Sequence, residues 1–304
     1  MAAVLLAACS PPEPPLAVGT YPWPGFATLY YAQSGGMLSP ETVRLLEFGS
    51  AREVLGALRS GTVDAGGMTL DEAMTLASSK NGFRIVMTFD FSAGADVLLA
   101  RPSITSLRGL RGKRVGVETE AEGEYILRRI LDIAHLRPEE VQVIDLPLDR
   151  HVEAYRNMEV DAVITFDPAR IELVSAGARE LFSSRDIASE IMDVLVVREE
   201  AIRTRPRALT SLVRAHFQAV EEIRANPGEV AQAVAPRFGP PGEVMEAWRL
   251  LEFQGRIANQ RLLSEGGIRP VLAQVFSVVS RARSGGKLDE LSFVDDSFVR
   301  GTSP

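Results

Sequence analysis

The sequence is poor in the residues that build metal sites, disulfides and catalytic centres. It has one cysteine, Cys9, and three histidines, His135, His151 and His216. No histidine stands in a metal-like cluster or beside a nucleophile, so we predict neither a metal site nor a catalytic residue. A glycine-rich phosphate loop is also missing, and no cofactor is predicted. We expect His151 to begin a helix and His216 to lie on a helix of the C-terminal region, both at the surface.

Charge and hydropathy exclude two further classes of protein. Lysine and arginine are scattered along a chain of net charge −7, so nothing attracts a polyanion such as nucleic acid. No apolar run reaches the roughly 18 residues that a membrane-spanning helix needs. The hydrophobic fraction of 46% and the charged fraction of 24% are ordinary for a soluble globular protein. A length of 304 residues allows two domains.

Residues 1–15 carry the pattern of an export signal followed by a tether. Residues 2–8 form a short apolar segment that ends in small side chains, as the apolar region of an export signal does. Leu6-Ala7-Ala8-Cys9 resembles the bacterial lipoprotein signal, in which the cysteine becomes the lipidated first residue of the mature protein. The proline-rich stretch 10–15 is then a stiff tether. We predict lipidation at Cys9, with this anchor as the only membrane contact, in the periplasm or on the outer cell surface. The alternative is a disordered N-terminus with a chance cysteine.

One pattern occurs twice in the chain. Each copy has a helix, the tripeptide Val-Asp-Ala and an apolar strand that ends on threonine and aspartate. The copies span residues 50–71 and 151–167, and their terminal polar residues are Thr69, Asp71, Thr165 and Asp167. Because ligands bind outside the carboxyl ends of strands in open α/β sheets, two such ends predict a two-lobed small-molecule receptor. The alternative is that Val-Asp-Ala is only a common helix–strand junction.

Strands and helices alternate along the first two thirds of the chain. Besides the two strands of the repeated pattern, we predict apolar strands at residues 16–21, 43–48, 84–89, 97–100, 112–118, 141–146 and near 192–197. The helix of the first copy has Ser50 as its N-cap and Val54, Leu55 and Leu58 at helical spacing, and a helix over residues 119–134 begins at Thr119. This alternating order indicates an α/β fold with parallel-rich sheets.

A linker at residues 101–106, followed by a fresh strand from Gly112, predicts a second sheet. We therefore expect a first lobe of residues 16–102 plus 199–304 and a second lobe of residues 103–198, with two hinge crossings. Residues 206–283 are almost wholly helical by pattern, with a break at 226–228, a helix at 242–253 and a last segment at 288–299 that buries Leu291 and Phe293.

Two aromatic residues flank a rigid loop after the first predicted strand. Tyr21 and Trp23 stand around Pro22, and Pro24-Gly25 follows. Because the prolines restrict this backbone, both rings are held where a ligand could lie against them. The alternative is that Trp23 caps the core.

These features together resemble one known family. They are the lipoprotein-like start, residues 21–25 with Leu29-Tyr30-Tyr31-Ala32, residues 54–69, and residues 107–117 with their Leu-x-Gly-Lys-x-Val-Gly-Val sequence. Over roughly residues 16–296 the chain resembles the substrate-binding proteins of ABC importers in the nitrate, sulfonate, taurine and thiamine-precursor group. The resemblance implies the type II periplasmic-binding-protein fold. This fold has two α/β lobes, each a parallel-rich sheet flanked by helices, and a helical C-terminal tail. It also implies a monomer that binds a small-molecule solute and docks on an importer permease.

The resemblance also implies where the ligand binds. The family's contacting loops correspond here to Tyr21, Trp23, Thr69, Asp71, Glu118, Thr119, Phe166 and Asp167. The sequence departs from the family at residues 118–122, Glu-Thr-Glu-Ala-Glu, where anion-binding relatives often carry glycine and serine. Acidic residues at this helix start predict an acidic cleft, and therefore a cationic or zwitterionic solute rather than an inorganic anion. The alternative is that these glutamates point outward.

The leading hypothesis is a binding protein that has no chemistry of its own and acts by lobe closure. Two alternatives remain open from the sequence. One is an enzyme of the pyrimidine-synthase-like branch of the same fold, and the other is a sensory receptor lobe that signals to a partner.

Overall fold

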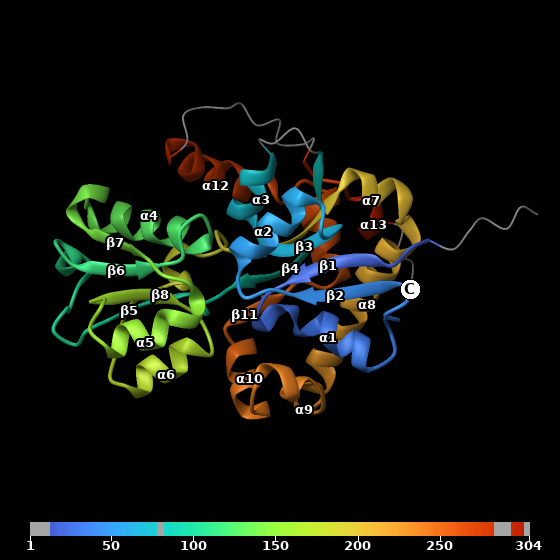
Figure 1. Ribbon diagram of the computed structural model, residues 1–304. Helices are drawn as coiled ribbons and strands as arrows, with labels where there is room; N and C mark the ends of the chain where they lie inside the picture. Colours follow the sequence, from blue (N-terminus) through green and yellow to red (C-terminus); the bar gives the residue numbers. More distant parts are fainter. Residues whose placement is uncertain (1–12, 78–81, 283–292, 301–304) are drawn as a thin grey trace, which may run out of the picture.

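The computed structural model describes residues 13–77, 82–282 and 293–300, which form two lobes side by side (Figure 1). The first lobe contains a six-stranded sheet of β1 (Leu16–Thr20), β2 (Val43–Glu47), β3 (Ala65–Thr69), β4 (Phe83–Ser92), β10 (Met192–Arg198) and β11 (Leu251–Phe253). The second contains a five-stranded sheet of β5 (Val97–Ala100), β6 (Arg114–Val117), β7 (Gln142–Asp145), β8 (Ala162–Thr165) and β9 (Arg179–Ser183). The predicted α/β fold with two sheets is confirmed.

Each sheet contains three neighbouring strands that pair in parallel, next to strands that pair antiparallel. The strand orders are β11-β4-β10-β3-β1-β2 and β7-β6-β8-β5-β9. In the first sheet β1 pairs parallel with β2 and β3, and β10 runs antiparallel to β3 and β4. In the second, β6 pairs parallel with β7 and β8, whereas β5 is antiparallel to both of its neighbours. The carboxyl ends of β1 and β3 therefore meet at one edge, as those of β6 and β8 do.

Helices cover both faces of each sheet (Figure 1). The helices of the N-terminal segment are α1 (Ala27–Ser34), α2 (Ala51–Ser60) and α3 (Leu70–Ala77). The second lobe carries α4 (Glu122–Ala134), α5 (His151–Arg156) and α6 (Ala169–Ser175). The C-terminal part adds α7 (Glu199–Thr204), α8 (Pro206–Ala225), α9 (Pro227–Phe238), α10 (Pro241–Trp248), α11 (Arg256–Asn259), α12 (Arg269–Ala282) and α13 (Ser297–Arg300).

The twice-repeated sequence pattern has a structural basis in both lobes. As predicted, Ser50 caps α2, and its hydroxyl accepts from the backbone N–H of Glu53. The aspartate of each Val-Asp-Ala then ties down the neighbouring parallel strand. Asp64 accepts the backbone N–H of Ala17 at 2.9 Å, and Asp161 accepts that of Arg114 at 2.9 Å, with a sequence separation of 47 residues in each case. The two copies are therefore equivalent building units of the two lobes.

The crossovers between the lobes lie earlier than the sequence predicted. The chain leaves the first sheet after Ser92 and returns to it at Met192, so the predicted boundaries near residues 103 and 198 are wrong. Gly94, with a φ of 116°, makes the first turn between lobes. Its N–H donates to Ser184 Oγ at 2.7 Å, and Ser92 Oγ lies 2.7 Å from the same oxygen, so the two crossovers are bonded to each other. The proline-bearing stretch 101–106 is a surface connection after β5 instead.

The C-terminal tail is helical, as predicted, with one exception. The predicted break at residues 226–228 separates α8 from α9. The predicted helix 242–253 ends at Trp248, because residues 251–253 add to the edge of β4 as an antiparallel strand. Phe293 is buried, whereas Leu291 lies outside the described residues, as does Cys9. In the described part of the chain no single helix is long and apolar enough to span a membrane; one bent pair, Arg256–Ser264 with Arg269–Arg281, passes by length and composition.

Candidate functional site

A pocket lies between the lobes, at the carboxyl ends of β1, β6 and β8. The first lobe contributes Tyr21, Ala51 and Glu72, and the crossover contributes Asp96. The second lobe contributes Glu118, Ala121, Glu122, Gly123, Ile126, Leu148, His151, Ile164, Thr165 and Phe166. The cavity volume is about 30 Å³, which is room for only a few water molecules. The lobes are therefore closed down on the pocket, and a solute of several heavy atoms enters only if they separate.

The charged side chains that line the pocket are carboxylates. Asp96 is 1% exposed and Glu122 is 7% exposed, and neither Asp96 Oδ2 nor Glu122 Oε1 has a hydrogen-bond donor among the described residues. Burial raises the pKa of Asp96 to about 7. Burial, followed by the charges of nearby carboxyl groups, Asp96 first, raises the pKa of Glu122 well above its usual value. Glu122 therefore faces the pocket rather than solvent, as Glu118 does, whereas Glu120 is exposed. That the cleft binds a cationic or zwitterionic solute stays a prediction.

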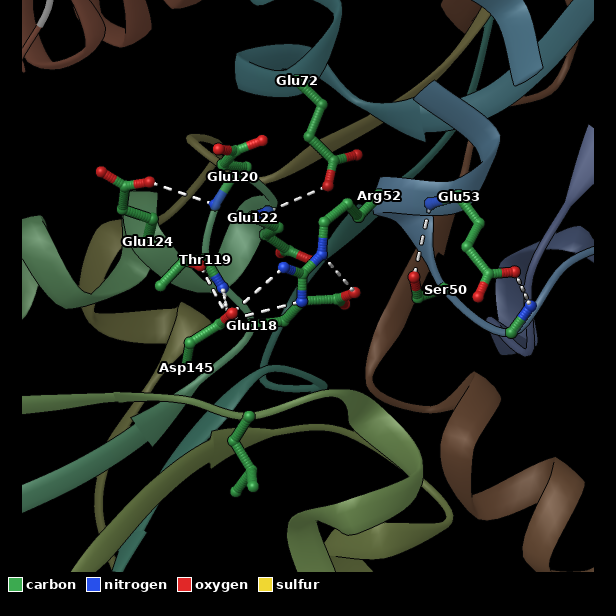
Figure 2. A network of polar contacts seen from close by, with 12 residues as sticks. Ser50, Arg52, Glu53, Glu72, Glu118, Thr119, Glu120, Glu122, Glu124 and Asp145 are labelled. Atoms are coloured by element: carbon green, nitrogen blue, oxygen red, sulfur yellow. Dashed lines mark hydrogen bonds and ion pairs between the residues drawn. The ribbon is translucent and has the colours of Figure 1, made fainter. Parts of the chain in front are cut away.

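Glu72 connects the two lobes at the start of α4. Its Oε2 accepts the N–H of Thr69 at 2.9 Å. Its Oε1 accepts the N–H of Glu122, the first residue of α4, at 2.9 Å (Figure 2). A helix N-terminus of this kind is a ready-made anion site, and here the protein's own carboxylate occupies it. Burial raises the pKa of Glu72 to about 8, and the charge of Asp71 adds to the increase.

The loop before α4 differs from the sequence prediction, which began this helix at Thr119. Glu120 has a φ of 60° and Ala121 is extended, so the helix begins at Glu122. The N–H of Glu120 donates to Glu124 at 3.2 Å, and the side chain of Glu120 is exposed. Of the three glutamates predicted around this turn, Glu118 and Glu122 face the pocket.

An ion-pair cluster closes the mouth of the pocket. Arg52 of α2 donates to both carboxylate oxygens of Asp145, at 3.2 and 3.3 Å, and lies 3.6 Å from Glu118 (Figure 2). Thr119 donates its N–H and hydroxyl to the same Asp145, at 3.1 and 2.7 Å. Arg52 belongs to the first lobe and its partners to the second, so this cluster stabilises the closed arrangement.

A second carboxyl pair lies beneath the pocket in the first sheet. Asp90 of β4 and Asp193 of β10 are cross-strand neighbours, and both are fully buried. Burial raises the pKa of Asp90 to about 7, and burial together with the charge of Asp90 raises that of Asp193 well above its usual value. The acidic character of the site therefore extends from the pocket into the lobe behind it.

Two histidines are buried, contrary to the prediction that they lie at the surface. His151 lines the pocket, with Nδ1 3.0 Å from Thr165 Oγ1 and Nε2 3.1 Å from the carbonyl oxygen of Leu146. A carbonyl accepts only, so Nε2 carries the proton and Nδ1 accepts from the threonine. His216 makes the equivalent pair of bonds to Thr28 and Gln254. Burial lowers the pKa of each to about 4, so both rings are neutral near pH 7.

Three of the eight predicted ligand positions line the pocket: Tyr21, Glu118 and Phe166. Trp23 is 1% exposed and packs edge-on against Phe166, with ring centroids 5.1 Å apart, as its core alternative proposed. Thr69 ends β3 beneath Glu72 and contributes its backbone N–H. Ligand contact by the three lining residues stays a prediction.

The other three predicted positions lie around the pocket rather than in it. Asp71 sits in the first turn of α3, not in a loop, and faces a separate hollow against α4. Thr119 is bonded to Asp145, as described above. Asp167 pairs with Arg170 at 2.9 Å and faces another cavity beside Pro22 and Pro24.

Sequence reasoning missed two pocket carboxylates, Glu72 and Asp96. Glu72 follows Asp71 directly. Its position in the first turn of a helix, next to the carboxyl end of a strand, could have identified it as a candidate pocket residue. Asp96 lies in the first crossover, which the sequence prediction placed near residue 103 instead. Without the correct lobe boundary, nothing in the sequence indicated that Asp96 faces the space between the lobes.

Two hinged α/β lobes with a polar pocket between them define the architecture of periplasmic binding proteins, and comparisons with known proteins agree. The model of the NMT1-like family matches residues 10–237, and the chain belongs to this family. The taurine-binding periplasmic protein of Escherichia coli (strain K12) is 22% identical over 192 residues, which cover 62% of this chain and 60% of that protein. The chain spans 56–60% of the length of the curated relatives it matches.

Solved structures share the fold over nearly the whole chain. The ligand-binding component of an ABC-type import system from Staphylococcus aureus, with zinc bound, superposes with a TM-score of 0.79 at 13% identity, covering 96% of this chain and 99% of that one. The alkanesulfonate-binding protein SsuA from Xanthomonas axonopodis pv. citri, bound to MOPS, gives a TM-score of 0.77 at 18% identity, covering 94% and 100%. The predicted periplasmic-binding-protein fold is confirmed by these likenesses.

Proposed function

We propose that this chain is an extracytoplasmic solute-binding protein that captures a small organic solute between its lobes and delivers it to the permease of an ABC importer. The observation that carries the proposal is the pocket at the strand ends of both sheets, between lobes joined by two crossovers. Membership of the NMT1-like family supports it. The protein binds and releases its solute without chemistry of its own, and the closed form docks on the permease.

The interlobe contacts suggest how closure works. Arg52 with Asp145, and Glu72 with the N–H of Glu122, join the lobes only when these are closed. An exposed ion pair contributes about 0.2–1 kcal/mol, so this latch is weak enough to open. A solute that contacts both lobes adds its own binding free energy to the closed form and shifts the population toward it.

Small-angle scattering tests lobe closure. Solute that co-purifies with the protein is identified by mass spectrometry, removed, and added back at saturation. We expect the radius of gyration to fall on addition, and an unchanged scattering profile would contradict the proposal. Arg52→Gln should enlarge the ligand-free form, whereas Arg156→Gln, whose partner Glu172 lies in the same lobe, is the matched control. Uptake by liposomes that hold the permease then separates transport from sensing.

We further propose that Cys9 carries a lipid anchor and that the protein acts as a monomer. The Leu-Ala-Ala-Cys sequence and the proline-rich stretch after it support the anchor. Metabolic labelling with a fatty acid in a bacterial host should label the wild-type chain and leave Cys9→Ser unlabelled. Equal labelling of the two chains would refute the anchor without affecting solute binding.

A further inference from the structure

Three carboxylate oxygens that line the closed pocket are buried without a hydrogen-bond donor among the described residues: Asp96 Oδ2, Glu118 Oε1 and Glu122 Oε1. Glu118 Oε1 is ion-paired with Arg52 at 3.6 Å, which leaves Asp96 and Glu122 without a cationic partner. Asp96 comes from the crossover and Glu122 from α4, so the two side chains reach the pocket from different parts of the fold. A buried carboxylate without a partner costs free energy. Burial raises the pKa of both groups, and their side chains are hydrogen-bonded to each other when one is protonated, so in the absence of a cation the pair holds a proton. A bound donor of positive charge would relieve this cost.

Two backbone donors at the start of α4, where an anion would bind, are already engaged. The N–H of Glu122 at the start of α4 donates to Glu72, and the N–H of Glu120 donates to Glu124. Both backbone donors are thus used by the protein's own carboxylates. The nearest guanidinium, Arg52, is engaged by Asp145 and Glu118 at the mouth. A sulfonate or carboxylate on the solute would meet Glu72 rather than free donors.

Apart from Glu72, Glu118, His151 and Thr165, the remainder of the pocket is apolar or aromatic. Its largest such side chains are Ile126, Ile164, Tyr21 and Phe166. An ammonium group has three donors and no acceptor, which matches two free carboxylate oxygens. Aromatic faces beside it add a favourable cation–π contribution. Among the residues that the structure describes, no group of three or more His, Cys, Asp or Glu side chains is arranged to hold a metal ion, which favours an organic cation.

We propose that the pocket takes a small primary amine in its ammonium form, with a short apolar body and no acidic group. The ammonium is held by Asp96 and Glu122, and the side chain of Glu72 occupies the N–H groups of Thr69 and Glu122 that a sulfonate would otherwise use. This inference rests on the proposed function and specifies its solute class.

Titration calorimetry with matched probes tests the inference on the full chain. Propan-1-amine and propane-1-sulfonate differ only in their head group, and taurine carries both charges. We expect measurable binding of the amine, at least tenfold weaker binding of taurine, and no binding of the sulfonate. Asp96→Asn and Glu122→Gln should each weaken amine binding at least tenfold. Asp132→Asn, on the same helix but with a partly exposed side chain outside the pocket, is the matched control and should change it less than twofold.

A gain of function tests the role of Glu72. Glu72→Ala frees the N–H groups of Thr69 and Glu122, so this variant should acquire binding of propane-1-sulfonate that the wild type lacks. Circular dichroism and urea unfolding establish that each variant is folded. If Glu72→Ala does not fold, Glu72→Ser, whose shorter side chain frees the same two N–H groups, is used for the same comparison.

The outcomes separate this inference from the proposed function. Tight binding of propane-1-sulfonate by the wild type, or binding of zinc chloride but not of the amine, overturns the ammonium assignment and leaves solute capture intact. Failure of the amine to bind also overturns it. Only the absence of lobe closure with the co-purified solute contradicts the proposed function itself.

Discussion

Tyr21 and Trp23 stand two residues apart, yet the fold gives them different surroundings. Tyr21 lines the interlobe pocket, whereas Trp23 is buried between Phe166 and the carboxyl group of Asp90. The rigid loop that the sequence predicts does hold both rings. Their roles differ because only the outer ring reaches the space between the lobes.

We expect Trp23→Ala to lower the free energy of unfolding by about 3–5 kcal/mol, as for other large aromatic residues truncated in a core. Urea denaturation measures the change. Ile257→Ala is the control, since Ile257 is 66% exposed and surface truncations rarely exceed about 0.5 kcal/mol. If the Trp23→Ala protein were as stable as the wild type but no longer bound its solute, Trp23 would be a ligand contact rather than a core residue.

At the scale of elements, the repeated Val-Asp-Ala unit explains why the two lobes resemble each other. In each lobe the aspartate follows a helix and accepts the backbone N–H of the adjacent parallel strand. The sequence pattern therefore reports a shared way of joining a helix and two strands. The pocket lies at the opposite, carboxyl ends of these strands. The hydrogen bond of the aspartate therefore stabilises the fold of each lobe and does not itself contact the pocket.

Asp161→Ala should destabilise the protein by about 1–3 kcal/mol, because the N–H of Arg114 loses its acceptor. Asp161→Asn keeps an oxygen in place and should cost less. Urea unfolding of both variants checks the order. If Asp161→Ala and Asp161→Asn are equally stable, the hydrogen bond from the N–H of Arg114 does not explain why the Val-Asp-Ala motif occurs in both lobes.

For the whole molecule, a closed pocket surrounded by buried acids makes stability depend on pH. Glu72, Asp90 and Asp96 have pKa values of about 8, 7 and 7, well above those of unfolded chains. The folded state therefore holds protons that the unfolded state has released, and this stability is lost as pH rises through these values. His151 and His216 act in the opposite direction, but only below about pH 6.5, the ordinary histidine pKa.

Between pH 6.5 and 8 we expect the ligand-free protein to lose about 1–2 kcal/mol of stability for each such carboxyl group. Thermal unfolding across this range measures the loss. Glu72→Gln should reduce the dependence by the share that Glu72 contributes. A melting temperature that stays constant or rises over this range would show that these carboxyl groups are not protonated in the folded state.

Much of the architecture follows from the sequence, because local signals determine where elements begin and end. The helical spacing of Val54, Leu55 and Leu58 behind Ser50 defined α2, and the apolar runs placed nine of the strands correctly in outline. The short strands β9 and β11 were missed, because each is stabilised by pairing with a distant strand rather than by its own pattern.

The sequence by itself determined the fold class, the family and the acidic character of the second-lobe helix start. Only the tertiary structure decided which carboxylates face one another, because burial depends on partners far along the chain. Glu72 meets the start of α4 across 50 residues, and Ser92 meets Ser184 across 92. No local pattern contains such pairs. The same reason explains why His151 and His216 proved to be buried: each is neutral and satisfied by a threonine and a carbonyl that only the folded chain brings within reach.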